Sequence, residues 1–216
     1  MSPGSAADAT MSPGATFERV YHELKRMLAE GELPPGSPIE PALIGKQIAS
    51  SITPVRDALH RLTGERLVEA PNHNGFRVPL PSETALRDLY NWNAQLLLLA
   101  ARRKRPEPAA EALIFSSDED LVAAAANLFV EIARVTGSTE HVRAIQRLND
   151  RLAPFRRLEA QVLSDAKEEF ALLALYFGQG DGARLVALLE QHRRRRLRIV
   201  PALLAELDGS QAPKRG

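Results

Sequence analysis

The stretch Ser51-Ile52-Thr53-Pro54-Val55-Arg56-Asp57-Ala58-Leu59, in a chain of 216 residues, predicts the start of a helix. Ser51 and Thr53 are both of the types that cap helix N-termini, and Pro54 then lies in the first turn, where its missing N–H does no harm. Apolar residues at helical spacing form one buried face: Val55, Ala58, Leu59 and Leu62. The helix therefore presents small polar side chains and an arginine at its outer start.

Two helices precede this stretch, and two short strands follow it. Residues 17–28 carry one apolar stripe that ends at Gly31 and the following Pro-Pro-Gly turn, and residues 43–48 form a second, short helix. Residues 67–70 and 76–78 read as strands around a turn rich in Asn and Gly. Three helices and a β-hairpin wing form a winged helix-turn-helix, which places the start of its third helix in the DNA major groove.

Four segments together resemble the GntR family of bacterial regulators: residues 33–36, 51–59, 66–68 and 74–75. The resemblance implies that residues 16–79 bind double-stranded operator DNA. Position by position, it assigns phosphate and base contacts to Ser51 and Thr53 and the main base-reading role to Arg56. The wing tip corresponds to His73, Asn74 and Gly75, and Arg61 is added as a phosphate contact.

The chain departs from this family at Ile52, where a second arginine is usual, and at Ala42, where some members carry a basic residue. We expect an unusual operator and weaker binding, because each lost contact to guanine costs about 1–3 kcal/mol. Other interpretations stay open. Arg56 could pair with a surface Glu, Ser51 and Thr53 could act only as caps, and His73 and Arg61 could simply be solvated.

Residues 80–208 are rich in Leu, Ala, Arg and Glu at helical spacing and predict an all-α antiparallel bundle of about six helices. The expected helices cover residues 82–105, 121–136, 139–153, 154–177 and 181–200, with a last turn or two at 202–207. The whole chain is thus expected to be mainly α. Residues 1–15 and 209–216 are expected to be disordered tails.

This bundle resembles the FCD effector domain of the FadR subfamily, whose members often hold a divalent metal with one Asp and three His. The corresponding positions here are Ala126, Val130, Phe170 and His192. A lone imidazole cannot hold such an ion against water, so we predict no metal and no other cofactor. The polar candidates for binding a small-molecule effector are Trp92, Asn93, Arg134 and His192; the alternative is a packed bundle without a ligand. Residues 193–196, four arginines, are interpreted as a solvated face.

Composition narrows the function further. The chain has no Cys, and its five His are scattered without a catalytic arrangement, so an enzyme is not expected. With no membrane span and no secretory signal, we expect a cytoplasmic protein. The four leucines 96–99 point around the whole helix, which favours a homodimer. The leading hypothesis is a dimeric, ligand-responsive repressor of a short palindrome; the alternative is an interaction module that has lost its effector site.

Overall fold

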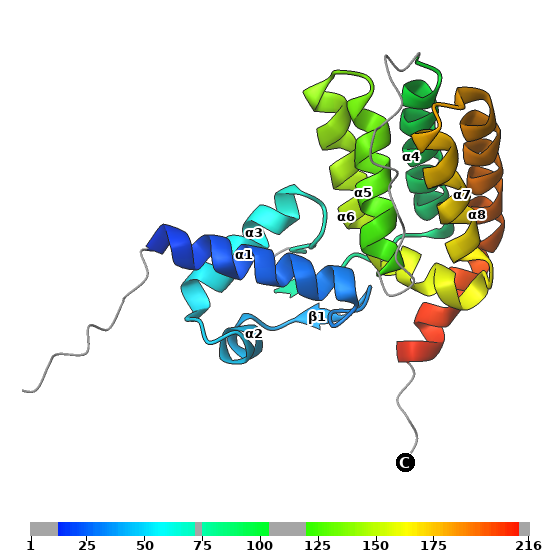
Figure 1. Cartoon of the computed structure of the whole chain (residues 1–216). Coiled ribbons are helices and arrows are strands. Elements are labelled where there is room, and N and C mark those ends of the chain that lie inside the picture. Colours follow the sequence, from blue (N-terminus) through cyan, green and yellow to red (C-terminus); the bar gives the residue numbers. More distant parts are fainter. Residues whose placement is uncertain (1–12, 72–74, 104–119, 212–216) are drawn as a thin grey trace, which may run out of the picture.

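The computed structural model describes residues 13–71, 75–103 and 120–211, and it divides them into two groups of helices (Figure 1). The fold is mainly helical, as predicted. The first group contains three helices and a small two-stranded sheet. In chain order its elements are α1 (Pro13–Glu30), β1 (Pro38–Ile39), α2 (Pro41–Gln47), α3 (Ile52–Gly64) and β2 (Phe76–Arg77).

The first group has its own hydrophobic core, formed mainly where α1 packs on α3. The predicted apolar faces of both helices are the buried ones, because residues three or four apart share a helix face. These buried side chains include Val20, Leu24, Met27, Val55, Ala58, Leu59 and Leu62. Burying this face of α3 leaves its opposite face in solvent.

The turn between α2 and α3 is held by backbone contacts. The Ser50 amide donates to the Gly45 carbonyl at 2.8 Å, and Ala49 takes a positive φ of 50°. A Cβ at Gly45 would lie only 2.8 Å from the Ser50 oxygen. From α1, Arg19 donates to the Ile48 carbonyl at 3.0 Å. These contacts fix the angle at which α3 begins.

The wing differs from the predicted hairpin. Phe76 and Arg77 pair antiparallel with Ile39 and Pro38, a strand that the sequence analysis did not assign. The predicted partner segment, residues 67–70, contributes a single bridge, between Glu69 and Arg77. Pro38 has no N–H to donate a hydrogen bond within the sheet, and each strand has only two residues. The sequence therefore contains no alternating pattern that predicts this pairing.

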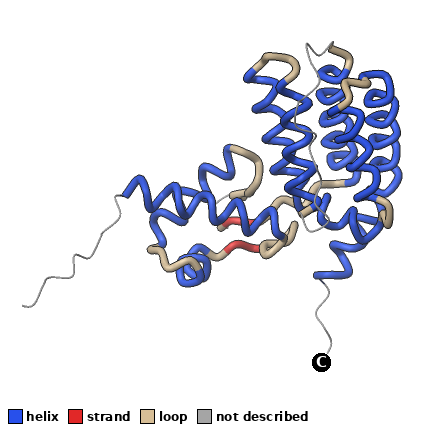
Figure 2. Tube along the Cα trace, in the orientation of Figure 1, coloured by secondary structure: helices blue, strands red, loops and turns tan. Residues whose placement is uncertain are grey.

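The second group contains five helices in the described residues rather than about six (Figure 2). Its helices are α4 (Glu83–Ala101), α5 (Leu121–Arg134), α6 (Thr139–Val162), α7 (Ala166–Gly178) and α8 (Gly182–Gln211). The predicted breaks at Pro154 and before Ala202 are wrong, since α6 contains Pro154 and α8 contains Pro201. A proline removes one hydrogen bond, but here the buried faces on both sides of it keep the helix continuous.

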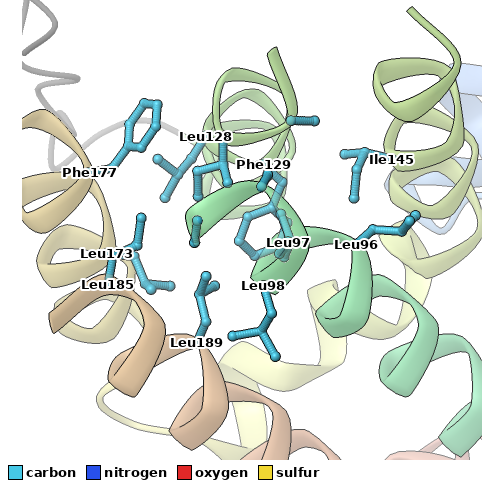
Figure 3. Close-up of a cluster of buried hydrophobic side chains, with 14 of the residues drawn as sticks. Leu96, Leu97, Leu98, Leu128, Phe129, Ile145, Leu173, Phe177, Leu185 and Leu189 are labelled. Atoms are coloured by element: carbon cyan, nitrogen blue, oxygen red, sulfur yellow. The ribbon is translucent and has the colours of Figure 1, made fainter. Parts of the chain in front are cut away.

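Helix α4 lies in the middle of the bundle and packs on α5, α6 and α8. Figure 3 shows side chains from α4, α5, α7 and α8 meeting in the main core, among them Leu97, Phe129, Leu173 and Leu189. Leu96, Leu97 and Leu98 are all buried in it, and only Leu99 of that run is exposed, at 54%. The bundle itself therefore absorbs most of the apolar surface that suggested a dimer.

The two groups meet where α1 crosses α6. Lys25 Nζ lies 2.5 Å from Asp150 Oδ2, and Arg157 Nε donates to the Ala29 carbonyl at 3.2 Å. Burial alone would lower the pKa of Lys25, but Asp150 outweighs it and raises that pKa. Among the described residues, none of the helices is long and apolar enough to cross a membrane.

Substituting Gly45 tests the turn between α2 and α3. Gly45→Ala should lower the free energy of unfolding by about 1–3 kcal/mol, because the new methyl group collides with a backbone oxygen. Gly64→Ala is the matched control, since nothing lies within 4 Å of a Cβ there. Urea unfolding of both variants measures the difference; equal stability of the two would show that the turn relaxes freely.

Candidate nucleic-acid interface

The exposed start of α3 is the candidate interface. Ser51 is the N-cap residue, with extended backbone and no side-chain capping bond, so its hydroxyl is not used by the helix. Ser51, Thr53 and Arg56 are all exposed. Among the described residues, no acid pairs with Arg56, so the expected alternative of a surface ion pair is not found. Two hydroxyls and a free guanidinium thus face outward from one helix end.

Neighbouring residues of α2 and α3 extend this face. Lys46 is exposed in the last turn of α2, and sequence reasoning overlooked it; its place one helix before the recognition stretch was the available signal. Leu43 and Ile52 are also exposed, at 56% and 49%. The face therefore combines cationic, polar and apolar side chains, and Ile52 offers methyl groups where an arginine would offer hydrogen-bond donors.

Arg61 lies on another side of α3. Its guanidinium stacks on the Tyr21 ring, 4.0 Å from the centroid, and its Nη1 lies 3.0 Å from Glu18 Oε1. Both partners belong to α1. A DNA contact by Arg61 stays a prediction, and it would require these contacts to break.

The wing is described only in part. Gly75 is exposed with a φ of 83°, a conformation that favours glycine. His73 and Asn74 lie outside the described residues. Behind the wing, the His60 ring of α3 meets the Phe76 ring edge to face, with centroids 5.0 Å apart. This contact connects the wing to α3.

The four predicted effector residues do not converge on one site. Trp92 is 51% exposed on the outer face of α4, and Arg134 is exposed and paired with Glu131 at 3.0 Å. Asn93 and His192 are buried inside the bundle, at 3% and 6% exposure. The structure thus separates an inner pair from two surface residues.

The bundle interior contains a network of buried charges. Arg196 is fully buried; its Nε lies 3.0 Å from Glu159 Oε2, and its Nη1 contacts Glu169 Oε2. The Tyr90 hydroxyl donates to Glu159 Oε1 at 2.7 Å. Arg156 donates to Asn149 at 2.8 Å, and its guanidinium lies over the Phe129 ring. Helices α4, α5, α6, α7 and α8 all contribute to this interior.

The network fixes charge states. Burial would lower the pKa of Arg196, but Glu159 and Glu169 outweigh it and raise that pKa. Burial would raise the pKa of Glu169, but His192 and Arg196 hold it at about 2. Burial and the nearby Arg196 lower the pKa of His192 to about 4. At neutral pH the imidazole is therefore uncharged beside an ionised Glu169.

These residues do not fit a divalent metal. Three of the four corresponding positions are Ala126, Val130 and Phe170, which offer no side-chain ligand. The rings of Phe129 and Phe170 pack against the His192 ring, 5.7 and 5.4 Å between centroids. In the described part of the chain, no group of three His, Cys, Asp or Glu is arranged to hold a metal ion. The cation beside Glu169 is instead the guanidinium of Arg196.

The interpretation of residues 193–196 as a solvated face is wrong. Arg196 is buried, Arg195 lies 3.3 Å from Glu169, and Arg193 is paired with Glu190 at 3.1 Å. Of these four arginines, only Arg194 is both exposed and without a partner among the described residues. The acids that pair with the buried Arg196 lie on α6 and α7. The sequence of residues 193–196 alone therefore does not indicate that Arg196 is buried.

Comparison with known proteins agrees with this geometry. Residues 16–78 match the family described as "Bacterial regulatory proteins, gntR family". The chain is 27% identical over 210 residues to the HTH-type transcriptional repressor GlaR of Escherichia coli K12, covering 86% of this chain and 96% of that protein. It is 30% identical over 97 residues to the transcriptional regulator McbR of the same organism, covering 43% and 44% of the two chains.

Solved structures show the same fold. E. coli McbR/YncC superposes with a TM-score of 0.65 at 21% identity, covering 87% of this chain and 97% of that one. A GntR regulator from Rhodococcus sp. RHA1 gives a TM-score of 0.61 at 19% identity, covering 85% and 98%. The relatives are transcriptional regulators, not enzymes. Residues 16–78 therefore belong to the GntR family of bacterial regulatory proteins, and most of the chain is similar to transcriptional regulators.

Proposed function

We propose that this regulator is a repressor that binds a short palindromic operator as a homodimer. The observation that carries the proposal is Arg56, which has no ion-pair partner in the described ranges and projects beside Thr53 and Ser51 from the start of α3. Arginine can donate two hydrogen bonds to guanine in the major groove, and hydroxyls suit bases or phosphates. GlaR, a relative along most of the chain, is named a repressor, which supports the direction of regulation.

We propose that residues 16–79 form the DNA-binding domain and residues 80–208 an FCD-like domain. Separate hydrophobic cores support this division. One core runs from Val20 to Val78, and two clusters lie between Leu86 and Leu207. The match to the family covers nearly the same residues as the first domain. The wing residues His73, Asn74 and Gly75 are proposed to contact DNA together with α3.

For the bundle, two proposals remain. Either it binds a small effector beside the inner pair Asn93 and His192, or it has lost effector and metal binding and serves only for dimerisation. The side chains that fill the interior favour the second proposal, loss of effector and metal binding, for the site around Asn93 and His192. Arg196 already pairs with both carboxylates there, and the phenylalanines cover His192. Trp92 and Arg134 would act, if at all, at the surface.

Arg56→Ala should weaken binding to the selected operator by about 1–3 kcal/mol and barely change binding to random duplex, because a base contact is sequence-specific. Fluorescence anisotropy on a duplex selected from a randomised pool measures both affinities. Lys46→Ala is the control, since a phosphate contact weakens both duplexes equally. An equal loss for Arg56→Ala on both duplexes would make Arg56 a phosphate contact.

Removal of metal should not change the stability of the protein, whereas removal of the Arg196 side chain should lower it. Dialysis against a chelator should leave the unfolding midpoint unchanged, because no suitable ligand set surrounds His192. Arg196→Met should cost about 3–5 kcal/mol, because it leaves the buried Glu159 without its cation and removes one of the two arginines beside Glu169. Elemental mass spectrometry and urea unfolding test this pair. One tightly held metal ion per chain would refute the prediction that the protein binds no metal.

The full chain should have twice its monomer mass in light scattering at micromolar concentration. Within the described helices of the bundle, the exposed leucines are Leu99 on α4 and Leu172 and Leu175 on α7. We expect Leu99→Glu to shift the population toward monomer, because a charge opposes burial in an apolar interface. Leu43→Glu, on the DNA-binding face, is the control and should leave the mass unchanged. A wild-type monomer would place dimer formation on the DNA.

A further inference from the structure

A cleft of about 430 Å³ lies between the end of α3 and the helical bundle. On the α3 side it is bounded by Glu65 and Arg66, and on the bundle side by Trp92 of α4 and by Arg147 and Arg151 of α6. Its volume falls within the range of small-molecule sites. The cleft is distinct from the interior around Arg196 and from the exposed start of α3.

The cleft carries uncompensated positive charge. Within the described residues, the side chains of Arg66, Arg147 and Arg151 make no ion pair or hydrogen bond. Arg147 and Arg151 are four residues apart and so share one face of α6, where like charges repel. Burial, and then the charge of Arg66, lower the pKa of Arg151. An anion in the cleft would relieve this repulsion.

The acid at the edge of the cleft is already occupied. Tyr21 donates its hydroxyl to Glu65 at 2.8 Å, and Lys25 and Arg61 lie 3.8 and 3.5 Å from the same carboxylate. Glu65 lies within ion-pair distance of none of the three cleft arginines among the described contacts. In the described part of the chain, no acid supplies a counter-charge to these three arginines.

The backbone at Arg66 gives a second, independent observation. After the last turn of α3, the Leu67 amide donates to the Leu62 carbonyl and the Arg66 amide to the Thr63 carbonyl, both at 3.0 Å. This pair of bonds is the Schellman ending of a helix, whose left-handed residue is usually glycine. Here that residue is Arg66, with a φ of 61°. An arginine at this position weakens the fold, which is explicable if its side chain has a use.

We propose that this cleft binds a small phosphorylated molecule with a planar ring, the phosphate held by Arg66, Arg147 and Arg151 and the ring lying on Trp92. A guanidinium matches the oxygens of a phosphate with two parallel hydrogen bonds. An indole face, half exposed as Trp92 is, offers a stacking surface. Because Arg66 follows α3 while Arg147 and Arg151 belong to the bundle, the ligand bridges the two groups of helices. The inference does not depend on DNA binding.

Trp92 is the single tryptophan of the chain, so its fluorescence reports directly on the cleft. Full-length protein is titrated with adenosine 5′-monophosphate, inorganic phosphate and adenosine. We expect saturable quenching by adenosine 5′-monophosphate, weaker binding of phosphate, and no saturable response to uncharged adenosine. Absence of saturation with adenosine 5′-monophosphate, or an equal response to adenosine, would overturn the proposal.

Arg66→Gly separates binding from folding. It should weaken binding of adenosine 5′-monophosphate by roughly tenfold or more. Its unfolding midpoint without ligand should nevertheless rise by about 2–4 °C, because glycine accepts the positive φ. Arg194→Gln, at an exposed and unpaired arginine of α8, is the control and should bind like the original chain.

Two results would contradict this assignment. Equal loss of binding in Arg66→Gly and Arg194→Gln would show general charge attraction. Quenching of Trp92 by a random DNA duplex, with none by adenosine 5′-monophosphate, would make the cleft a contact for DNA phosphates. Both duplex and nucleotide titrations use the same fluorescence signal, so the outcomes are directly comparable.

Discussion

The unbroken course of α6 through Pro154 is the constraint on which the rest of the structure depends. This helix contacts α1 and every other helix of the bundle. Helical periodicity divides its side chains by direction: Asp150 and Arg157 face α1, while Asn149, Arg156 and Glu159 face the interior. If the helix ended at Pro154, the residues that face α1 and the residues that face the interior would not lie on two faces of one helix.

The interior network follows from that alternation. Glu159 arrives from α6, Glu169 from α7, and Arg196 from α8, so one guanidinium connects three helices. A buried ion pair repays its desolvation only when its remaining hydrogen bonds are made, and Tyr90 supplies one of these. Arg196 Nη2 and Asn93 Nδ2 nevertheless lack partners among the described residues. The network is better understood as fixing which helix faces meet than as a large net source of stability.

The sequence predicted those parts of the fold that local chemistry specifies. A serine cap, a proline in the first turn and a stripe at 55, 58, 59 and 62 are all local, and α3 follows them. Where the outcome depends on distant partners, the predictions were incomplete or wrong. Strand β1 has two residues and exists because Phe76 pairs with Ile39. Pro154 resembles a helix boundary until packing on both sides is known, and Arg196 resembles its solvated neighbour Arg194 until Glu159 and Glu169 are placed.

The candidate sites also differ in how far the local sequence predicts them. Outward projection of Ser51, Thr53 and Arg56 follows from one buried helix face, whereas Trp92 and Asn93, adjacent in sequence, differ in that Trp92 is exposed and Asn93 buried. Helix α3 is 13 residues long and so spans about 20 Å. Near its start it presents Arg56 to solvent, and its last turn leads into Arg66 beside α6. Because a helix of this length moves as one body, any force that holds Arg66 against α6 also orients Arg56. The connection between the bundle and the proposed DNA-reading face can therefore be a single rigid helix, without a rearrangement inside the first hydrophobic core.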